Sequence, residues 1–348
     1  MIDIKKYGWN PIMVSEDIIG EPARVTAVHK ERYEIACSHG ITFARLKSSV
    51  YYNSNNYEEF PTTGDFVLIA YNESGDSQII KTLPRKTFFS RRDPTPGRGE
   101  QAVAANFETV FIMQSLNHDF NVKRLERYLT LAWQSGAVPA VILTKADLVS
   151  DYNEQLRTAE RMCTGIAVYA VSAKDGTGIE DLSEYLKPGK TVVFLGSSGV
   201  GKSSLVNALT GVELMAVNTI REDDSKGRHT TTHRQLIMLL NGAMIIDTPG
   251  MRELGMWDVS TGLGETFTDV EELLGRCRFS DCHHETEPGC AIKRAIENGD
   301  LSIERWQSYL NLKKEAKYTE DKVGFMRERQ QWHKTLSKWQ KQNKKTGG

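Results

Sequence analysis

The chain has 348 residues, enough for two or three domains, and its 39% hydrophobic and 26% charged residues are typical of a soluble globular protein. No run of about 18 apolar residues occurs and residues 1–10 lack an apolar core, so we expect neither a transmembrane helix nor a secretory signal. Five cysteines form too sparse and odd a set for a disulfide scaffold, which favours a reducing, cytoplasmic setting, and the net charge of −1 does not by itself indicate a nucleic-acid partner.

Residues 1–84 are predicted to form a small β-barrel domain. Short β-rich runs are separated by turn residues, and these runs are 23–28, 33–37, 41–46, 65–71 and 78–83. Short strands at this spacing are typical of an OB-fold, which is the leading architecture for the domain.

Residues 85–104 are predicted to be a basic linker. Prolines and glycines are mixed here with arginines, and this composition interrupts regular elements. The segment is either a solvated connection or a loop that contacts phosphate groups, and the sequence favours neither alternative.

Residues 105–260 change to an alternation of strands and helices. The β-type runs are 107–113, 140–143, 166–171 and 192–195, and residues 122–133 have helical spacing. Asn241-Gly242 between two further β-rich runs predicts a hairpin. The rhythm predicts a multidomain α/β chain whose central domain is a parallel sheet with helices on both faces.

A glycine-rich loop follows the run 192–195. It comprises Gly196, Ser197, Ser198, Gly199, Val200, Gly201, Lys202 and Ser203, and Ser204 continues into a predicted helix. Backbone N–H groups of such a loop surround the β-phosphate of a nucleotide. Lys202 would reach the β- and γ-phosphates and the Ser203 hydroxyl would bind Mg²⁺, as in a P-loop nucleotide site.

Two motifs at the ends of other predicted strands indicate which base is bound. They are Thr144-Lys145-Ala146-Asp147 and Ser172-Ala173-Lys174. The Asp147 carboxylate can accept hydrogen bonds from guanine N1–H and N2–H₂, which adenine does not offer, while Lys145 lies along the base. The second motif can offer a backbone N–H to guanine O6. The predicted ligand is therefore a guanine nucleotide.

Asp247-Thr248-Pro249-Gly250 ends a strand after the hairpin, where Asp247 can hold Mg²⁺ through water and the Gly250 N–H can meet the γ-phosphate. In this chain the base-reading motifs precede the phosphate loop, whereas they follow it in most GTPases. We interpret this order as a circular permutation, which preserves the sheet because strands pair in space. The segment after Gly250 then leads directly into the C-terminal domain, so a γ-phosphate sensed there could move it.

A polar stretch at residues 216–234 stands where a first switch loop is expected. One of its threonines should complete the Mg²⁺ shell, and Thr231 and Thr232 are the candidates. Met251 occupies the position at which many GTPases carry a glutamine that orients the attacking water, so hydrolysis without a partner should be slow. His229 is the candidate for the missing catalytic group, which a partner could also supply.

Residues 261–348 are predicted to be a mostly helical zinc-binding domain. Cys277, Cys282, His284 and Cys290 have the spacing C-x4-C-x-H-x5-C, and three thiolates with one imidazole can close a tetrahedral Zn²⁺ shell of the structural type. His283 is the competing imidazole.

The end of the chain is strongly basic. Residues 322–348 contain eight Lys and Arg and one Glu, a net charge of +7, which leaves −8 on the rest. Trp332 and Trp339 lie seven apart, on one face of a predicted helix. Such a helix either packs on its own domain or stacks into RNA, and the charge favours contact with RNA.

With the permuted motif order, the sequence GRHTTT at residues 227–232 and the cysteine spacing in view, the chain resembles the RsgA (YjeQ/YloQ-like) family of small-ribosomal-subunit-dependent GTPases over nearly its whole length. The resemblance implies an N-terminal OB-fold, a central circularly permuted GTPase and a C-terminal zinc domain. It also implies late maturation of the 30S subunit, with 16S rRNA as a partner and GTP hydrolysis stimulated by the subunit and coupled to release. The long basic tail and Met251, where the family often has an aromatic residue, are departures from the pattern.

The sequence thus predicts a monomeric, ribosome-triggered GTPase whose flanking domains bind RNA. A second interpretation, kept open by Met251, is an RNA-binding guanine-nucleotide sensor with negligible turnover. A membrane-associated GTPase is disfavoured because the sequence carries no apolar or lipidation signal.

Overall fold

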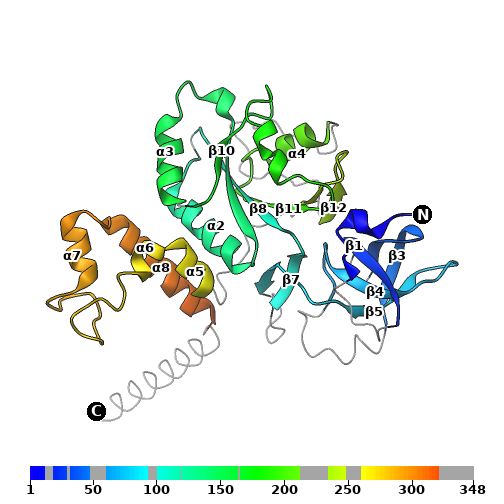
Figure 1. The fold of residues 1–348 in the computed structure, drawn as a ribbon, viewed down its shortest axis with the longest axis horizontal. Coiled ribbons are helices and arrows are strands. Elements are labelled where there is room, and N and C mark those ends of the chain that lie inside the picture. The colour runs from blue at the N-terminus through cyan, green and yellow to red at the C-terminus, as the bar shows by residue number, and fades with distance from the viewer. Residues whose placement is uncertain are drawn as a thin grey trace, which may run out of the picture. The chain divides into compact units, whose positions relative to one another are not determined.

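The computed structural model describes residues 1–11, 19–29, 32–47, 60–92, 100–117, 119–163, 165–211, 234–247 and 260–320. The chain divides into two compact units, Met1–Leu254 and Gly255–Gly348. Figure 1 shows the first unit as a small barrel joined to a larger sheet with helices, and the second as a group of helices.

The N-terminal strands close into a barrel. They are β1 (Glu21–His29), β2 (Arg32–Cys37), β3 (Gly40–Leu46), β4 (Phe66–Ala70) and β5 (Ser77–Thr82). All neighbouring pairs are antiparallel except the parallel pair β3–β5, and β4 returns to pair with β1. The interior is filled by alternate side chains such as Val25, Ile35 and Ile79, all fully buried. The predicted OB-type barrel is confirmed.

A two-stranded sheet follows the barrel, where the sequence had suggested a linker over residues 85–104. Strands β6 (Phe88–Arg92) and β7 (Glu100–Ala105) pair antiparallel. The prolines and glycines that suggested a linker are concentrated in residues 93–99, which lie outside the described residues. The flanking strands carry apolar side chains that become buried, and Phe89 stacks on Phe107 with ring centroids 5.0 Å apart. The composition of residues 85–104 taken together therefore suggested a linker, although the Pro- and Gly-rich part is only the segment between the two strands.

The central domain is built on the predicted parallel sheet. Its strands are β8 (Thr109–Ser115), β9 (Val138–Thr144), β10 (Val168–Ala170), β11 (Thr191–Gly196), β12 (Gln235–Met238) and β13 (Met244–Asp247). They lie in the order β10-β9-β8-β11-β13-β12, and only β12 is antiparallel to its neighbour in this series. Asn241-Gly242 forms the predicted turn between β12 and β13, with Gly242 at φ +82°.

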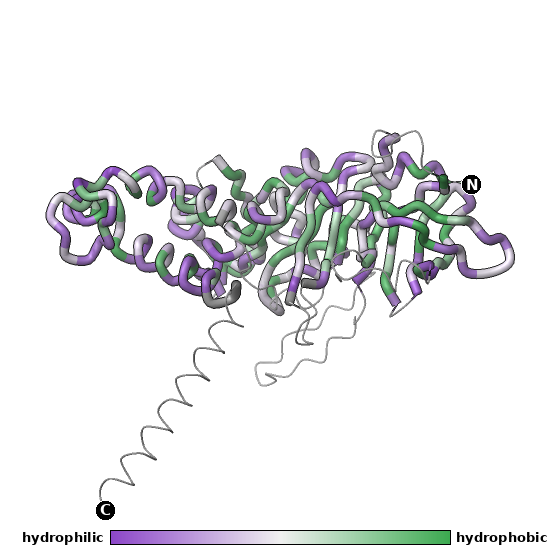
Figure 2. Tube along the Cα trace, turned by 90° about the horizontal axis from the view of Figure 1, so that it is seen from below, coloured by the Kyte–Doolittle hydropathy of each residue, from purple (hydrophilic) through white to green (hydrophobic). Residues whose placement is uncertain are grey.

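Helices cover this sheet on both faces. They are α2 (Val122–Gln134), α3 (Asn153–Met162) and α4 (Lys202–Thr210), with short 3₁₀ turns η4 (Ala146–Leu148) and η5 (Glu180–Glu184). Figure 1 shows α4 on the opposite side of the sheet from α2. The core between α4 and the strands includes Phe111, Phe194 and Leu205, each no more than 1% exposed. In Figure 2 the strands of the first unit are correspondingly hydrophobic.

The barrel and the central sheet are continuous. Strand β1 pairs with β12 through Ala27 and Gln235, and Thr63 Oγ1 donates to the Arg234 carbonyl at 3.3 Å. Arg24, 1% exposed, lies at this junction and donates to the carbonyls of Tyr7 at 2.6 Å and Asn106 at 2.7 Å. The first unit is therefore held together by strand pairing and by a buried cation.

The described part of the second unit is helical, as predicted. It contains α5 (Ser260–Thr266), α6 (Thr268–Glu271), α7 (Ala291–Asn298) and α8 (Ile303–Glu320). Phe267 and Tyr309 meet edge to face in its small core, and the Tyr309 hydroxyl donates to Glu271 at 2.8 Å. Over the residues that the structure describes, no helix combines the length and the apolar character needed to span a bilayer.

Candidate functional site

The carboxyl ends of the parallel strands gather the predicted motifs at one edge of the sheet. Gly196 is the last residue of β11, Thr144 of β9 and Asp247 of β13. Register places Gly196 opposite Met113 of β8 and Thr144 opposite Ser115. This edge is where open α/β sheets bind ligands.

The phosphate loop between β11 and α4 depends on glycine at defined positions. Gly199 and Gly201 have φ of +74° and +100°, in the region that disfavours side chains. A Cβ on Gly196 would lie 2.9 Å from the Met113 carbonyl oxygen of the neighbouring strand. The loop can therefore present its backbone amides at the start of α4, where the helix dipole adds a partial positive charge.

The predicted side chains of the loop follow from this backbone. Lys202 begins α4, and its Nζ donates to the Gly196 carbonyl at 3.2 Å, across the mouth of the loop. Ser203 and Ser204 lie in the first turn of the same helix, while Ser198 lies between the two buried residues Ser197 and Val200 in the loop itself. Cationic, hydroxyl and amide groups thus lie together around the space in which phosphates bind in such loops.

Asp247 provides the carboxylate of the site. Its side chain ends β13 and the residue is 7% exposed. Burial raises the pKa of Asp247, while the positive charge of Lys202 acts in the opposite direction. The Asp247 carboxylate and the Ser203 hydroxyl are oxygen ligands of the kind that Mg²⁺ prefers.

The two base-reading motifs lie side by side because β9 and β10 are paired. Asp147 lies in η4, and its Oδ1 accepts a hydrogen bond from the Ser172 hydroxyl at 3.0 Å. The Ser172 oxygen in turn accepts from the Lys174 amide at 3.2 Å, which orders the turn containing Ala173. Lys145 has φ +62°, a left-handed conformation that begins η4. The Asp147 carboxylate is thus oriented by its neighbours.

Thr144, the first residue of the predicted base-reading motif, contacts the phosphate loop. Its Oγ1 lies 2.5 Å from the Val200 carbonyl oxygen and 3.2 Å from that of Gln114, so the hydroxyl contacts the phosphate loop. The motif at the end of β9 therefore supports the loop with its first residue and offers Asp147 from its last.

Asp119 was not singled out from the sequence. Its Oδ2 accepts a hydrogen bond from the Ser197 hydroxyl at 2.6 Å, and its carboxylate pairs with Arg124 at 2.9 Å. In the sequence, the one feature that could have pointed to Asp119 is its position just after the buried strand β8. The carboxyl end of β8 lies at the same edge of the sheet as the phosphate loop.

Several predicted residues lie outside the described residues. They are the switch residues His229, Thr231 and Thr232, the γ-phosphate residue Gly250, its neighbour Met251, and the basic tail 322–348. Their roles stay predictions.

A second cluster lies in the helical unit. Ligand atoms of Cys277, Cys282, His284 and Cys290 all lie within 4.8 Å of one another. His284 Nδ1 is 3.5, 3.7 and 3.4 Å from the three sulfurs in that order, and the Cys277 and Cys290 sulfurs are 4.0 Å apart. A tetrahedral ion with Zn–S bonds of about 2.3 Å and a Zn–N bond of about 2.0 Å requires separations of about 3.5–3.8 Å. The cluster could therefore hold a metal ion.

The loop that carries these ligands is ordered by backbone contacts. The Glu287 carboxylate accepts from the amides of His283, Glu285 and Thr286, each at 3.0 Å. Hydrogen bonding to its own backbone amide and to these three amides lowers the pKa of Glu287 to about 2. The His284 ring meets the Trp306 ring of α8 edge to face at 5.5 Å. The competing imidazole of His283 is not among the clustered ligand atoms of the described residues.

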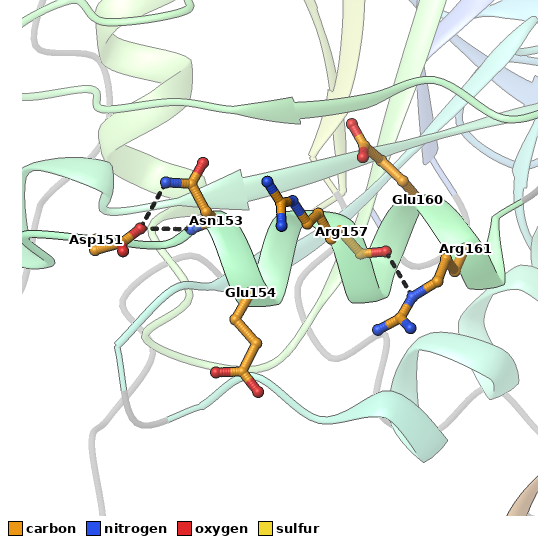
Figure 3. A pocket seen from close by; sticks show the side chains of 6 residues that line it. All are labelled: Asp151, Asn153, Glu154, Arg157, Glu160 and Arg161. Atoms are coloured by element: carbon orange, nitrogen blue, oxygen red, sulfur yellow. Dashed lines mark hydrogen bonds between the residues drawn. The ribbon is translucent and has the colours of Figure 1, made fainter.

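A surface hollow of the first unit shares no residue with either cluster. It lies along α3, has a volume of about 740 Å³ and is lined by charged side chains such as Glu154, Arg157 and Arg161 (Figure 3). In it, Arg161 Nε donates to the Arg157 carbonyl within the helix itself. It contains no residue of the phosphate loop and does not identify a site.

Comparisons with known proteins agree with this geometry. The RsgA GTPase family model matches residues 82–257, and the ABC transporter model matches residues 179–343, less than half of the chain, which include the phosphate loop common to both classes. The "Small ribosomal subunit biogenesis GTPase RsgA 2" of Listeria monocytogenes is 46% identical over 317 residues, 90% of each chain. The structure of YjeQ from Thermotoga maritima matches 84% of this chain and 97% of its own with a TM-score of 0.62 and 26% identity. That of YloQ, a circularly permuted GTPase, matches 88% and 98% with a TM-score of 0.59; its 22% identity supports the fold alone.

The burial of Asp247 leads to a prediction about stability. Because burial raises its pKa, the charged carboxylate destabilises the folded protein above the pKa of the unfolded state, about 3.9. Without nucleotide and Mg²⁺, Asp247→Asn should therefore raise the free energy of unfolding at pH 7.5 by about 1 kcal/mol. The gain should disappear below about pH 4, where the wild-type group is neutral in both states.

Urea unfolding at the two pH values measures this difference. Asp181→Asn, at an exposed position in η5, serves as the control and should change stability by less than about 0.5 kcal/mol. A loss of stability in Asp247→Asn at pH 7.5 would contradict the prediction.

Proposed function

The chain belongs to the RsgA GTPase family, and from this premise we propose that it binds and hydrolyses GTP as a biogenesis factor of the small ribosomal subunit. The observation that carries the proposal is the convergence of the phosphate loop, Asp247 and the Asp147–Ser172 pair on one sheet edge. The order of these motifs along the chain is that of a circularly permuted GTPase.

One set of groups would bind the phosphates of the nucleotide, and a separate set would bind its base. The amides of residues 196–203 bind the α- and β-phosphates, and Lys202 neutralises charge at the β- and γ-phosphates. Ser203 and Asp247 would hold Mg²⁺, together with Thr231 or Thr232, and the ion when bound would neutralise charge on the phosphate oxygens. Gly250 would sense the γ-phosphate.

Guanine would be selected by the carboxylate of Asp147. Its oxygens accept hydrogen bonds, so they favour the N1–H and N2–H₂ edge of guanine over adenine. The hydrogen bond from Ser172 holds the carboxylate in place, and the amides near Ala173 and Lys174 are available to guanine O6. Lys145 would lie along the base.

Hydrolysis would need help from outside the site. Met251 offers no group that orients water, so we assign that role to His229 or to the ribosomal particle. The barrel and the basic tail would bind 16S rRNA on either side of the GTPase, because OB-type barrels and basic aromatic helices both suit RNA. We expect a monomer that works in the cytoplasm, where the ribosomal subunits are.

The second cluster would hold a structural zinc ion. Cys277, Cys282, His284 and Cys290 would complete its shell, so the ion would have no open position for catalysis. It would fix the loop between α6 and α7 in a unit whose apolar core is small.

The test is GTP hydrolysis with and without purified small ribosomal subunits. We expect slow turnover by the protein alone and stimulation of at least about 100-fold by small subunits, since such transition-state groups contribute factors of 10³–10⁵ in related GTPases. Large subunits and ATP are the controls. Binding of guanine nucleotide without any stimulated turnover would instead support the nucleotide-sensing interpretation.

The base contact is tested by Asp147→Asn. The amide donates where the carboxylate accepted, so affinity for GDP should fall about 100-fold while affinity for xanthosine diphosphate rises. Competition titrations against a fluorescent guanine nucleotide measure both affinities. An unchanged preference for guanine would refute the assignment of Asp147.

The metal assignment is tested by Cys282→Ser. Losing one thiolate should remove zinc from the purified protein and expose the second unit to proteolysis, while GDP affinity stays within about twofold. Metal content by atomic emission and limited proteolysis give the two readouts. Cys163→Ser, at a buried cysteine of the first unit, is the matched control and should retain its zinc.

A further inference from the structure

The phosphate loop is tied to a part of the protein that no nucleotide motif includes. Ser197 Oγ donates to Asp119 Oδ2 at 2.6 Å, a short hydrogen bond to a charged acceptor. Ser197 is 7% exposed and the Asp119 side chain 40% exposed, so the bond is shielded from water on the donor side. We propose that Asp119 is a positioning residue that sets the conformation of the phosphate loop for nucleotide binding. The inference rests on the proposed guanine-nucleotide site.

Asp119 is itself held in place. Arg124 Nη1 donates to its two carboxylate oxygens at 2.9 and 3.0 Å, and Arg124 Nη2 donates to its carbonyl at 3.2 Å. Arg124 lies in the first turn of α2, where its amide donates to the capping side chain of Asn121 at 3.0 Å. The carboxylate therefore has a fixed orientation set by the start of a helix.

The connection between β8 and α2 is ordered from its other side as well. Gln114 Oε1 accepts from the Asn121 amide at 2.7 Å, and Gln114 Nε2 donates to the Asn121 carbonyl at 3.0 Å. Gln114 lies near the end of β8 and Asn121 caps α2, so these bonds tie the end of the strand to the start of the helix. Asp119 thus projects from a braced connection, as an effective positioning group must.

The loop needs such support because its own backbone is permissive. Gly199 and Gly201 adopt positive φ, and each glycine has more conformations to lose on ordering than other residues. Asp119 fixes the loop at Ser197, and Thr144 contacts it at Val200. The two contacts bracket Ser198 and Gly199, whose amides face the phosphates in loops of this type. The links join protein groups only, so they favour binding by preorganisation.

The charge of Asp119 explains the presence of Arg124. An isolated carboxylate next to a polyphosphate site would repel the ligand. The paired guanidinium offsets that charge, and Oδ2 accepts from Ser197 as well as from Arg124. A charged carboxylate oxygen is a stronger acceptor for the Ser197 hydroxyl than a neutral amide oxygen would be.

Three variants of the full-length protein test the proposal. Ser197→Ala removes the donor and Asp119→Ala the acceptor, so each should raise the Kd for GDP and GTP about tenfold. Asp119→Asn retains an acceptor oxygen and should stay within about threefold of wild type. The double variant should be no weaker than the worse single variant, because both changes break the same bond. In subunit-stimulated hydrolysis, KM should rise more than kcat falls.

The matched control is Asp269→Ala, which breaks an aspartate–arginine pair of similar geometry in the second unit and should leave nucleotide affinity unchanged. Thermal unfolding checks that each variant folds, and Ser197→Ala keeps the test informative if Asp119→Ala does not. Wild-type affinity in folded Ser197→Ala, or additive losses in the double variant, would overturn the role of Asp119. Absence of guanine-nucleotide binding by the wild type would instead overturn the proposed function.

Discussion

The nucleotide site depends on one geometric constraint, the shared carboxyl edge of a parallel sheet. Because β9, β8, β11 and β13 run in the same direction, the residues that follow them emerge together whatever their order in the chain. Gly196 of β11 lies so close to the Met113 carbonyl oxygen of β8 that a Cβ at this position would push the two strands apart. A circular permutation changes the connections between the strands but not this edge. The motifs can therefore occur in a different order along the chain and still lie close together in the folded protein.

A second constraint lies at the lateral edge of the central sheet. Strand β12, which follows the polar stretch 216–234, is the sheet edge to which the barrel attaches through β1. Burial lowers the pKa of Arg24 at this junction to about 10, while the charges of Glu108 and Asp65 oppose the change. A guanidinium satisfies several backbone carbonyls at once, which an apolar side chain in the same space would leave without donors. Hydrogen bonds from Arg24, together with the pairing of β1 with β12, therefore fix the position of the barrel on the central sheet.

Local sequence pattern predicted the elements well and the contacts between them poorly. The strands of the barrel, the phosphate loop and the hairpin at Asn241-Gly242 each have a signal within a few residues. The β6–β7 sheet was missed because the prolines and glycines between its strands dominate the composition of the segment. The bond between Asp119 and Ser197 joins residues 78 positions apart, and a lone aspartate after a strand has no pattern that names its partner. Likewise, no local pattern predicts the contacts of the Thr144 hydroxyl with the carbonyl oxygens of Val200 and Gln114.

The two units gain their stability from different sources, and this difference determines which polar groups each can accommodate. The first unit buries a continuous sheet with Phe111, Phe194 and Ile245 at its centre. A core of this size offsets the cost of burying the Asp247 carboxyl group, for which we propose a role in holding Mg²⁺. The second unit has a few aromatic contacts around Phe267 and Tyr309 and a long loop between α6 and α7. Three thiols and an imidazole are brought together in that loop, at separations that suit an ion, by backbone bonds to Glu287 and by a left-handed residue at His284. Small domains of this kind commonly use metal coordination where apolar area is insufficient. A folded loop in the second unit would then depend on the metal that we propose, whereas the nucleotide site depends on the sheet and on contacts between protein groups at its edge.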